Sequence, residues 1–404
     1  MRRVAITGMG VVSSIGANVA EVTKALKEAK SGVTFAPEFA EHGFKSQVYA
    51  KPPVNVEEAL DRRTRRFMGE GAAWNYMAMQ EAIADARLAP DEISHPRTGI
   101  IMGSGGPSTE SLVQAADITR ENKSTKRIGP TVVPKAMSST NSATLAVPFK
   151  ILGVNYSISS ACATSVHCIG AAAEQIIWGK QDVVFAGGGE DLHWTMANLF
   201  DAMGAMATAF NETPATASRA YDKNRDGFVI AGGAGVVVLE EMERAKARGA
   251  TIYGEIVGYF ANSDGYDMVQ LSGEGAVRCM GEAIKTVKQP IDYINTHGTS
   301  TPVGDSKETA ALREVFGAKI PPFSSTKSLT GHSLGAVGAQ ETIYSLIMMR
   351  DKFLCASAHI EEIDPEFDDL PIVRTRVDDA QIDCFLTNSF GFGGTNGCLV
   401  VSRV

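Results

Sequence analysis

The feature that most constrains the fold of this 404-residue chain is an internal repeat. Moved by 165 residues, the segment SSACATSVHCIGAAAEQ (159–175) falls without a gap on SSTKSLTGHSLGAVGAQ (324–340), and six of the seventeen positions are identical. Self-similarity of this kind indicates duplicated supersecondary structure. The repeat predicts two similar halves, residues 1–245 and 246–404. In each copy we expect a strand, a tight Ser-Ser turn and then a helix of small residues.

Short apolar runs alternate with helical patterns along the whole chain. The runs RTGIIMGSG, QDVVFAGGG, AGVVVLEE and IDYINTHG are typical of buried strands, whereas NVAEVTKALKEAKSG and AVRCMGEAIKTV have helical periodicity. This alternation predicts an α/β fold with helices on both faces of the sheets.

Charge and cysteine usage exclude several functional classes. The net charge of −8 argues against general nucleic-acid binding. No apolar run reaches the roughly 18 residues that a membrane span requires. The six cysteines are scattered without a CxxC pair, so we expect a reduced, cytoplasmic setting.

Cys162 is the strongest candidate for a nucleophile. The repeat aligns it with Lys327, at the point where each helix is expected to begin. The positive end of a helix dipole favours the thiolate, so this position predicts a lowered pKa. The alternative is a small buried cysteine at a turn. We expect that plainer role for the other five cysteines: Cys168, Cys279, Cys355, Cys384 and Cys398.

Two histidines are candidates to act with Cys162. His297 lies in INTHGTSTPVGD and His332 in STKSLTGHSLGA, two loops of small polar residues that each follow a predicted strand. His167, inside the first repeat helix, is expected to be a hydrogen-bonded core residue. No set of His, Cys and carboxylate residues shows metal-ligand spacing in the sequence, so no metal site is expected.

Two motifs suggest other functions. Gly8-x-Gly10 after the first strand is part of a dinucleotide-binding fingerprint, but the third glycine and the later acidic residue are missing. Gly331-His332-Ser333-Leu334-Gly335 matches the nucleophile elbow of α/β-hydrolases and would make Ser333 reactive. The residues before it are polar, whereas that elbow requires an apolar strand.

Four segments follow one another along the chain in this order: SISSACATSVHCIGAA, NTHGTSTPVGD, STKSLTGHSLGAVG and NSFGFGGTN. They resemble the active-site signatures of the β-ketoacyl-acyl carrier protein synthases, and the similarity covers essentially the whole chain. The segments are more similar to the synthase I type of bacterial type II fatty acid synthesis than to the synthase II type, which is the alternative. The resemblance implies a thiolase fold, an αβαβα arrangement of five layers with two similar halves, and a homodimer.

The resemblance also implies a reaction. A decarboxylating condensation would join an acyl group, held on Cys162, to malonyl carrier protein and release carbon dioxide and free carrier protein. His297 and His332 would donate hydrogen bonds to the enolate, and the backbone N–H groups of Cys162 and Phe392 would hold the tetrahedral oxyanion. No cofactor is expected, because the substrates arrive on the phosphopantetheine arm of the carrier protein.

Further roles follow from the same resemblance. Lys327 resembles the active-site lysine of the family and is expected to pair with Glu308. Thr299 and Thr301 match positions that hydrogen-bond the pantetheine arm. The remaining expected substrate contacts are the gate residues Phe390 and Phe392, the channel residues Phe200 and Phe228, and Pro107 at the end of the acyl channel. Relatives have glycine or a branched residue at the last position, so the acyl-length preference does not carry over.

Two basic clusters stand out on this acidic chain. Acyl carrier proteins are strongly acidic, so a local basic patch would attract this partner. The alternative is that both clusters are ordinary solvated helix faces. The residues expected to contact the carrier protein are Arg62, Arg63, Arg65 and Arg66 in the first cluster, and Lys123, Lys126 and Arg127 in the second.

Overall fold

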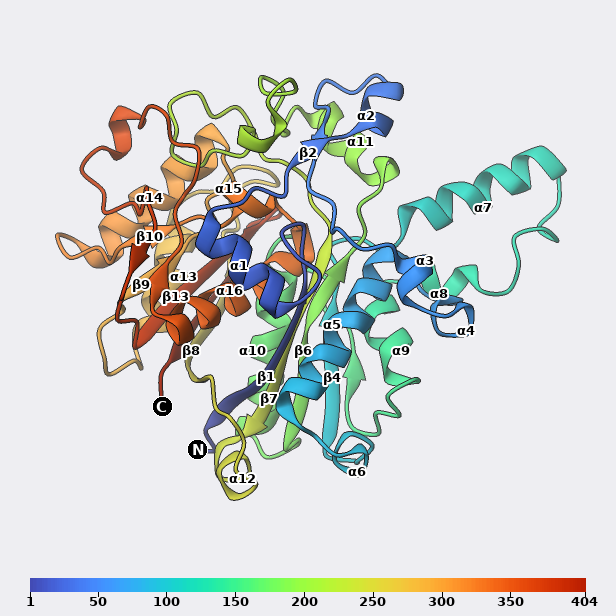
Figure 1. Ribbon diagram of the computed structural model, residues 1–404, viewed down its shortest axis with the longest axis horizontal. Coiled ribbons are helices and arrows are strands. Elements are labelled where there is room, and N and C mark those ends of the chain that lie inside the picture. The colour runs from blue at the N-terminus through green and yellow to red at the C-terminus, as the bar shows by residue number, and fades with distance from the viewer.

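A computed structural model describes residues 1–404. Its main sheet has ten strands in the order β10-β9-β13-β14-β8-β1-β7-β6-β4-β5 (Figure 1). The strands of the N-terminal half are β1 (Val4–Val12), β4 (Thr98–Gly103), β5 (Asn155–Tyr156), β6 (Val183–Glu190) and β7 (Gly233–Glu241). Those of the C-terminal half are β8 (Gly254–Ser263), β9 (Tyr293–Asn295), β10 (Phe323–Ser324), β13 (Cys384–Gly391) and β14 (Thr395–Ser402).

The two halves have the same topology. The order β5-β4-β6-β7-β1 in the first half matches β10-β9-β13-β14-β8 in the second. The first two pairings are parallel and the last two antiparallel in both halves. The halves meet where β1 pairs with β8, with Val4 opposite Ile256 and Ile6 opposite Gly254. The predicted pair of similar halves is therefore confirmed.

Helices cover and separate the two halves of the sheet. Helices α5 (Glu70–Ala86) and α9 (Thr140–Ala146) pack on the outer face of the first half, and α13 (Glu274–Ile284) and α14 (Pro302–Phe316) lie outside the second. Between them, α10 (Thr164–Ile177) and α16 (Val337–Asp351) contact strands of both halves. This arrangement confirms the predicted thiolase fold with five αβαβα layers.

The remaining elements are short or peripheral. The other helices are α1 (Val19–Glu28), α2 (Pro37–Glu41), α3 (Val56–Ala59), α4 (Arg62–Arg65), α6 (Pro90–Ile93), α7 (Thr109–Asn122), α8 (Val132–Ala136), α11 (Trp194–Met203), α12 (Met242–Ala247) and α15 (Lys327–Thr330). Two small antiparallel sheets of two strands each pair β2 (Thr34–Phe35) with β3 (Val48–Tyr49) and β11 (Phe353–Leu354) with β12 (Val377–Asp378). Single 3₁₀ turns span Pro214–Thr216, Leu334–Ala336 and Pro365–Phe367.

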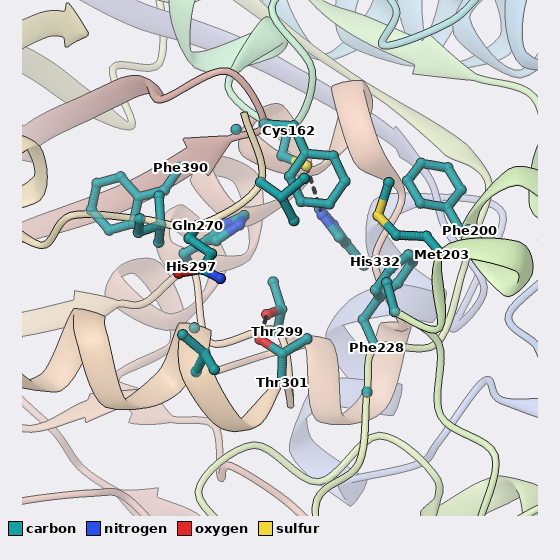
Figure 2. A pocket seen from close by; sticks show the side chains of 18 of the residues that line it. Cys162, Phe200, Met203, Phe228, Gln270, His297, Thr299, Thr301, His332 and Phe390 are labelled. Carbon is teal, nitrogen blue, oxygen red and sulfur yellow. Dashed lines mark hydrogen bonds between the residues drawn. The ribbon is translucent and has the colours of Figure 1, made fainter. Parts of the chain in front are cut away.

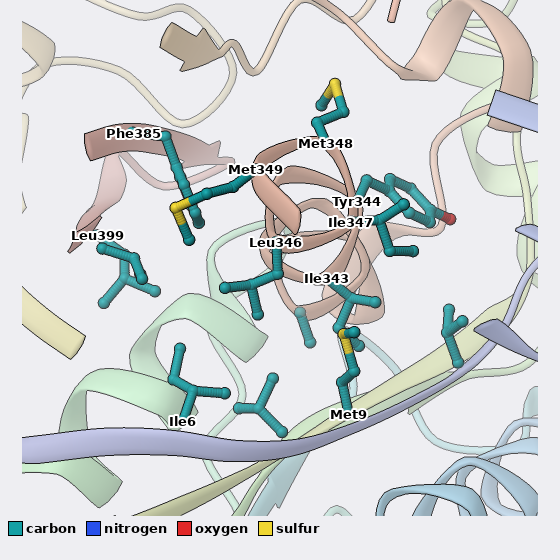
Figure 3. Packing of buried hydrophobic residues seen from close by; sticks show 14 of the residues in the cluster. Ile6, Met9, Ile343, Tyr344, Leu346, Ile347, Met348, Met349, Phe385 and Leu399 are labelled. Atoms are coloured by element: carbon teal, nitrogen blue, oxygen red, sulfur yellow. The ribbon is translucent and has the colours of Figure 1, made fainter. Parts of the chain in front are cut away.

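Helix α16 forms the centre of the largest hydrophobic cluster. Every residue from Val337 to Met349 is buried. A helix that is buried all round belongs to the interior of a protein rather than to its surface. Figure 3 shows Ile343, Leu346 and Met349 extending from this helix toward residues of both halves of the sheet, among them Ile6, Met9, Phe385 and Leu399.

The two repeat copies differ after their Ser-Ser turns. In the first copy α10 begins two residues after Cys162, as expected. In the second, Lys327 begins only the single turn α15, because Gly331 adopts a left-handed backbone with φ of 66° and ends it. His332 then forms an extended bridge with Ile230, and the long helix α16 starts only at Val337.

No helix in the structure combines the length and the apolar character that crossing a membrane requires. The boundary predicted between residues 245 and 246 falls inside α12, which links β7 to β8, and its placement remains a prediction.

Gly10 lies in β1 beneath α5, and this contact explains the glycine without a nucleotide. A Cβ atom at Gly10 would lie 1.9 Å from the carbonyl oxygen of Ala78 in α5. We expect Gly10→Ala to lower the free energy of unfolding by about 1–3 kcal/mol, because helix and strand must move apart. A Cβ atom at Gly281 in α13 would have no other atom within 4 Å. Gly281→Ala should therefore raise the free energy of unfolding by about 0.5–1 kcal/mol. Urea denaturation of both variants measures the difference, and a Gly10→Ala protein as stable as the parent would contradict this packing.

Candidate active site

Cys162, His297 and His332 line one cavity of about 380 Å³. Figure 2 shows their side chains converging on it, with a hydrogen bond between His332 and Cys162. The three residues come from different elements: Cys162 precedes α10, His297 follows β9, and His332 follows α15. The structure therefore brings the predicted nucleophile and both predicted histidines together.

The reactive atoms are close to one another. Nε2 of His332 lies 3.0 Å from Sγ of Cys162. The two imidazole rings have centroids 5.4 Å apart and stand nearly perpendicular. Sγ and one nitrogen of each ring all lie within 4.8 Å of one another, so a metal ion could also be held here, which the sequence spacing did not indicate.

The turn before Cys162 is strained and held by local hydrogen bonds. Ala161 has a left-handed backbone with φ of 48°, which costs about 1 kcal/mol or more in a residue with a Cβ atom. The N–H of Ser160 donates to Oγ1 of Thr164, and the N–H of Ala163 donates to the carbonyl of Ser160. These bonds fix the backbone of Cys162 at the start of α10.

The side chain of His167 links the same turn to strand β14. One ring nitrogen lies 2.7 Å from Oγ of Ser160, and the other lies 3.1 Å from the carbonyl oxygen of Asn396. Because a carbonyl can only accept, Nε2 carries the ring proton and Nδ1 accepts from the Ser160 hydroxyl. His167 is the satisfied core residue that the sequence predicted.

Burial decides the protonation of the site. It raises the pKa of the Cys162 thiol to about 12, against the opposing effect of the nearby Lys327 ammonium. The lowered pKa expected from the helix dipole is therefore wrong for this thiol. Burial and Lys327 together hold the pKa values of His297 and His332 well below their usual value, so both rings are neutral at pH 7.

Lys327 pairs with Glu341 rather than with the predicted Glu308. Its Nζ donates to Oε1 of Glu341 and, at 2.6 Å, to the carbonyl oxygen of His297. Both side chains of the ion pair are almost fully buried. The correction follows from the position of Glu341 on the buried helix α16, beside the turn that begins with Lys327.

Glu308 instead holds the backbone of the His297 loop. Its carboxylate accepts the N–H groups of His297 and Gly298, each at 2.8 Å, and the side-chain amide of Asn388 at 3.2 Å. The carboxylate on α14 thus fixes the turn that carries the histidine.

Aromatic rings and two hydroxyls surround the reactive atoms. The ring of Phe228 contacts that of His332, and the ring of Phe390 contacts that of His297. The hydroxyls of Thr299 and Thr301 lie 2.9 Å apart at the cavity wall. Phe200 and Phe392 also line the cavity, and Phe392 is 37% exposed. These six predicted substrate contacts all line one cavity. Figure 2 shows Phe200, Phe228, Phe390, Thr299 and Thr301 around it.

Sequence reasoning missed part of the lining and included one residue from elsewhere. Met203, Val269, Gln270, Leu271, Val303 and Leu334 line the cavity without having been predicted. The spacing of Met203 from Phe200 on one helix could have indicated that residue, whereas the loop at 269–271 carries no recognisable motif. Pro107 does not line this cavity.

The hydrolase alternative has no support in the geometry. Ser333 is buried and does not line the cavity. Its hydroxyl donates to Oε1 of Gln340 at 2.6 Å, so it is not paired with a histidine base.

The two basic clusters lie on separate elements. Arg62, Arg63 and Arg66 are exposed on and after α4, while Arg65 pairs with Glu57 at 3.0 Å. All four line a polar surface cavity of about 1010 Å³. The residues Lys123, Lys126 and Arg127 are exposed just beyond α7, a helix that projects from the body of the protein (Figure 1).

The raised pKa of Cys162 has a direct chemical consequence. Because only the thiolate reacts with iodoacetamide, the alkylation rate at Cys162 should rise about tenfold per pH unit between about pH 6 and 9, without a plateau. Lys327→Met should slow the reaction at each pH, since the ammonium that favours the thiolate is gone. Peptide mapping after timed labelling measures both effects. A plateau near neutral pH would mean that the thiol is already ionised.

Comparisons with known proteins agree with this geometry. A family model described as "Beta-ketoacyl synthase, N-terminal domain" matches residues 1–245, and its C-terminal counterpart matches residues 253–361. The chain is 57% identical to 3-oxoacyl-[acyl-carrier-protein] synthase 1 of Haemophilus influenzae, covering 100% of this chain and 99% of the relative. It is 56% identical to the enzyme of the same name from Escherichia coli K12, with both chains covered completely.

Solved structures give the same result. A beta-ketoacyl synthase from Burkholderia phymatum superposes with a TM-score of 0.93 at 35% identity, covering both chains completely. A type II polyketide ketosynthase, solved with its acyl carrier protein, gives a TM-score of 0.91 at 28% identity, covering 100% of this chain and 99% of the other. Sequence and fold similarity thus extend over the whole length of both halves, and this chain belongs to the beta-ketoacyl synthase family.

Proposed function

We propose that this protein condenses an acyl group with malonyl carrier protein to give β-ketoacyl carrier protein, carbon dioxide and free carrier protein. The observation that carries the proposal is the meeting of one thiol and two neutral imidazoles in a cavity walled mainly by apolar and aromatic side chains. The Haemophilus influenzae and Escherichia coli K12 relatives, at 57% and 56% identity, are both named synthase 1, which favours the synthase I type of fatty acid elongation over the synthase II type.

In the first half-reaction, Sγ of Cys162 attacks the carbonyl carbon of an acyl thioester. The new C–S bond replaces the bond to the pantetheine sulfur, and the proton of the Cys162 thiol leaves with the displaced carrier thiol. Nε2 of His332 lies 3.0 Å from Sγ, beside the bond that forms. The backbone N–H groups of Cys162 and Phe392 are the proposed donors to the tetrahedral oxyanion.

In the second half-reaction, malonyl carrier protein loses carbon dioxide and becomes an enolate of its thioester. Neutral imidazoles can stabilise the enolate oxygen by donating an N–H, and each such donor contributes about 3–4 kcal/mol at a site sheltered from water. The enolate carbon then attacks the carbonyl of the acyl group on Cys162, the C–S bond to Cys162 breaks, and the departing thiolate takes up one proton from water. The loss of carbon dioxide drives the step, so we propose that no cofactor or metal takes part.

Lys327 and Glu308 hold the backbone that carries His297. Lys327 donates to the carbonyl of His297 and adds to the effect of burial in lowering the pKa of both rings, while Glu308 holds the His297 backbone. Thr299 and Thr301 are proposed to bind the pantetheine arm because their hydroxyls lie together at the cavity wall. Phe390 near the end of β13 and Phe392 in the Gly-rich turn that follows are proposed as the gate.

The proposed partners are an acyl carrier protein and a second copy of this chain. The structural relative solved with its acyl carrier protein supports the first, as does the exposed basic cluster of α4. For the second, β5 is an edge strand that pairs only with β4, and Tyr156 on it is exposed. Val147 and Leu152, which precede this strand, are also exposed, and a dimer interface would bury all three.

The acyl-enzyme intermediate can be observed directly. Incubation with a medium-chain acyl carrier protein should add one acyl group to Cys162, and Cys162→Ala should remove the adduct. Malonyl carrier protein should then discharge it as β-ketoacyl product. His297→Ala should keep the adduct but slow the discharge by about 100–1000-fold, because one donor to the enolate is lost. Intact-protein mass spectrometry with peptide mapping measures each step, and a fluorophosphonate adduct on Ser333 with an unmodified Cys162 would favour the hydrolase instead.

Carrier-protein binding at the first basic cluster is tested by charge reversal. The double variant Arg62→Glu and Arg66→Glu should raise KM for carrier-protein substrates about tenfold at low salt, with a smaller difference at high salt, where surface charges are screened. The matched control reverses Lys246 and Lys285, two exposed lysines on α12 and after α13. An unchanged KM at low salt would remove this cluster from the docking surface.

A further inference from the structure

Glu190 is a buried carboxylate near the active site that the proposed reaction does not use. It is the last residue of β6 and is 1% exposed. Burial raises its pKa to about 7. Its oxygens form no ion pair, and its hydrogen-bond partners are three backbone N–H groups and one hydroxyl.

These partners come from two separate loops. On one side are the N–H of Gly105 at 2.6 Å, the N–H of Gly106 at 3.0 Å and the hydroxyl of Ser104 at 2.8 Å. On the other side is the N–H of Gly335 at 2.8 Å. The loops touch, since a Cβ atom at Gly335 would lie 2.2 Å from the backbone nitrogen of Gly105. The carboxylate therefore ties two glycine-rich backbones together.

The second loop forms part of the active-site wall. Leu334 lines the cavity that contains Cys162 and lies two residues after His332. Its backbone is left-handed, with φ of 44°, a strained conformation for a leucine. A strained residue keeps its conformation only where its neighbours hold it, and Glu190 holds the next N–H along the chain.

The first loop, residues 104–106, lies against a second part of the same cavity wall, helix α11. A Cβ atom at Gly106 would lie 2.4 Å from the terminal methyl of Met196. Met196 precedes Phe200 by one turn of α11, so both project from the same side of that helix, and Phe200 lines the cavity. Movement of the loop would thus reach the cavity through Met196 as well as through Leu334.

We propose that Glu190 is a positioning residue that holds Leu334 as the wall of the acyl site and thereby limits the length of acyl chain that Cys162 accepts. This inference rests on the proposed function, because it requires an acyl group on Cys162. The carboxylate acts through the two loops and does not touch the reacting atoms.

The test compares two acyl lengths on the same enzyme. Wild type, Glu190→Leu and Glu190→Gln are incubated with octanoyl or palmitoyl carrier protein, and the initial rate of adduct formation on Cys162 is followed by mass spectrometry. Glu190→Leu leaves three N–H groups without their acceptor, so the wall should open and the palmitoyl-to-octanoyl rate ratio should rise about tenfold, the equivalent of one lost buried hydrogen bond. Glu190→Gln keeps one oxygen and should shift the ratio less, in the same direction.

Glu81 provides a matched control. Its carboxylate on α5 also accepts backbone N–H groups, those of Val11 and Val19, but it lies outside the cavity. Glu81→Leu and Glu81→Gln should keep the wild-type ratio whatever their stability, which separates positioning from general destabilisation. If Glu190→Leu does not fold, Glu190→Gln and Ser104→Ala provide the test, because each removes part of the same hydrogen-bond set and should raise the palmitoyl-to-octanoyl rate ratio.

Two results would overturn the proposal in distinguishable ways. If the wild type forms both adducts and the Glu190 variants keep its rate ratio, Glu190 has no positioning role and the proposed function stands. If Cys162 of the wild type takes up neither acyl group, the proposed function fails and the inference fails with it.

Discussion

The active site depends on the burial of two helices, α10 and α16, between the two halves of the sheet. Neither helix could be stable alone with so little polar surface, and each covers apolar strands of both halves. Packing them side by side brings together the loops that precede them. Cys162 and His332, 170 positions apart in the chain, meet at 3.0 Å for this reason.

The same burial controls the charges of the site. Away from water, neutral forms are favoured, so the thiol keeps its proton and both imidazoles stay uncharged. One ion pair, between Lys327 and Glu341, persists because its members neutralise each other and the ammonium also donates to a carbonyl. A site whose two imidazoles are neutral hydrogen-bond donors follows from this environment.

The sequence predicted the members of the site better than their contacts. Seven of the nine predicted reactive and lining residues lie in the four short segments that carry the resemblance, whereas Phe200 and Phe228 lie outside them. The structure brings all nine to one cavity. The partner of Lys327 was predicted wrongly, because Glu341 and Glu308 are both near it and only the packing of α16 decides which carboxylate faces the ammonium. The lowered thiol pKa was wrong for a similar reason, since the helix position is visible in the sequence but the degree of burial is not.

The repeat by itself determined the doubled α/β architecture, because two copies of one pattern of strands and helices must bury similar faces. The different roles of equivalent residues in the two copies were decided by the tertiary structure. His167 and His332 occupy equivalent positions of the repeat, yet His167 lies within α10 and bonds to Ser160 and Asn396, whereas His332 faces Cys162. The difference arises because Gly331 ends α15 and lets the chain pair with Ile230 before α16 begins. That pairing partner comes from a distant part of the chain, and only folding brings it there.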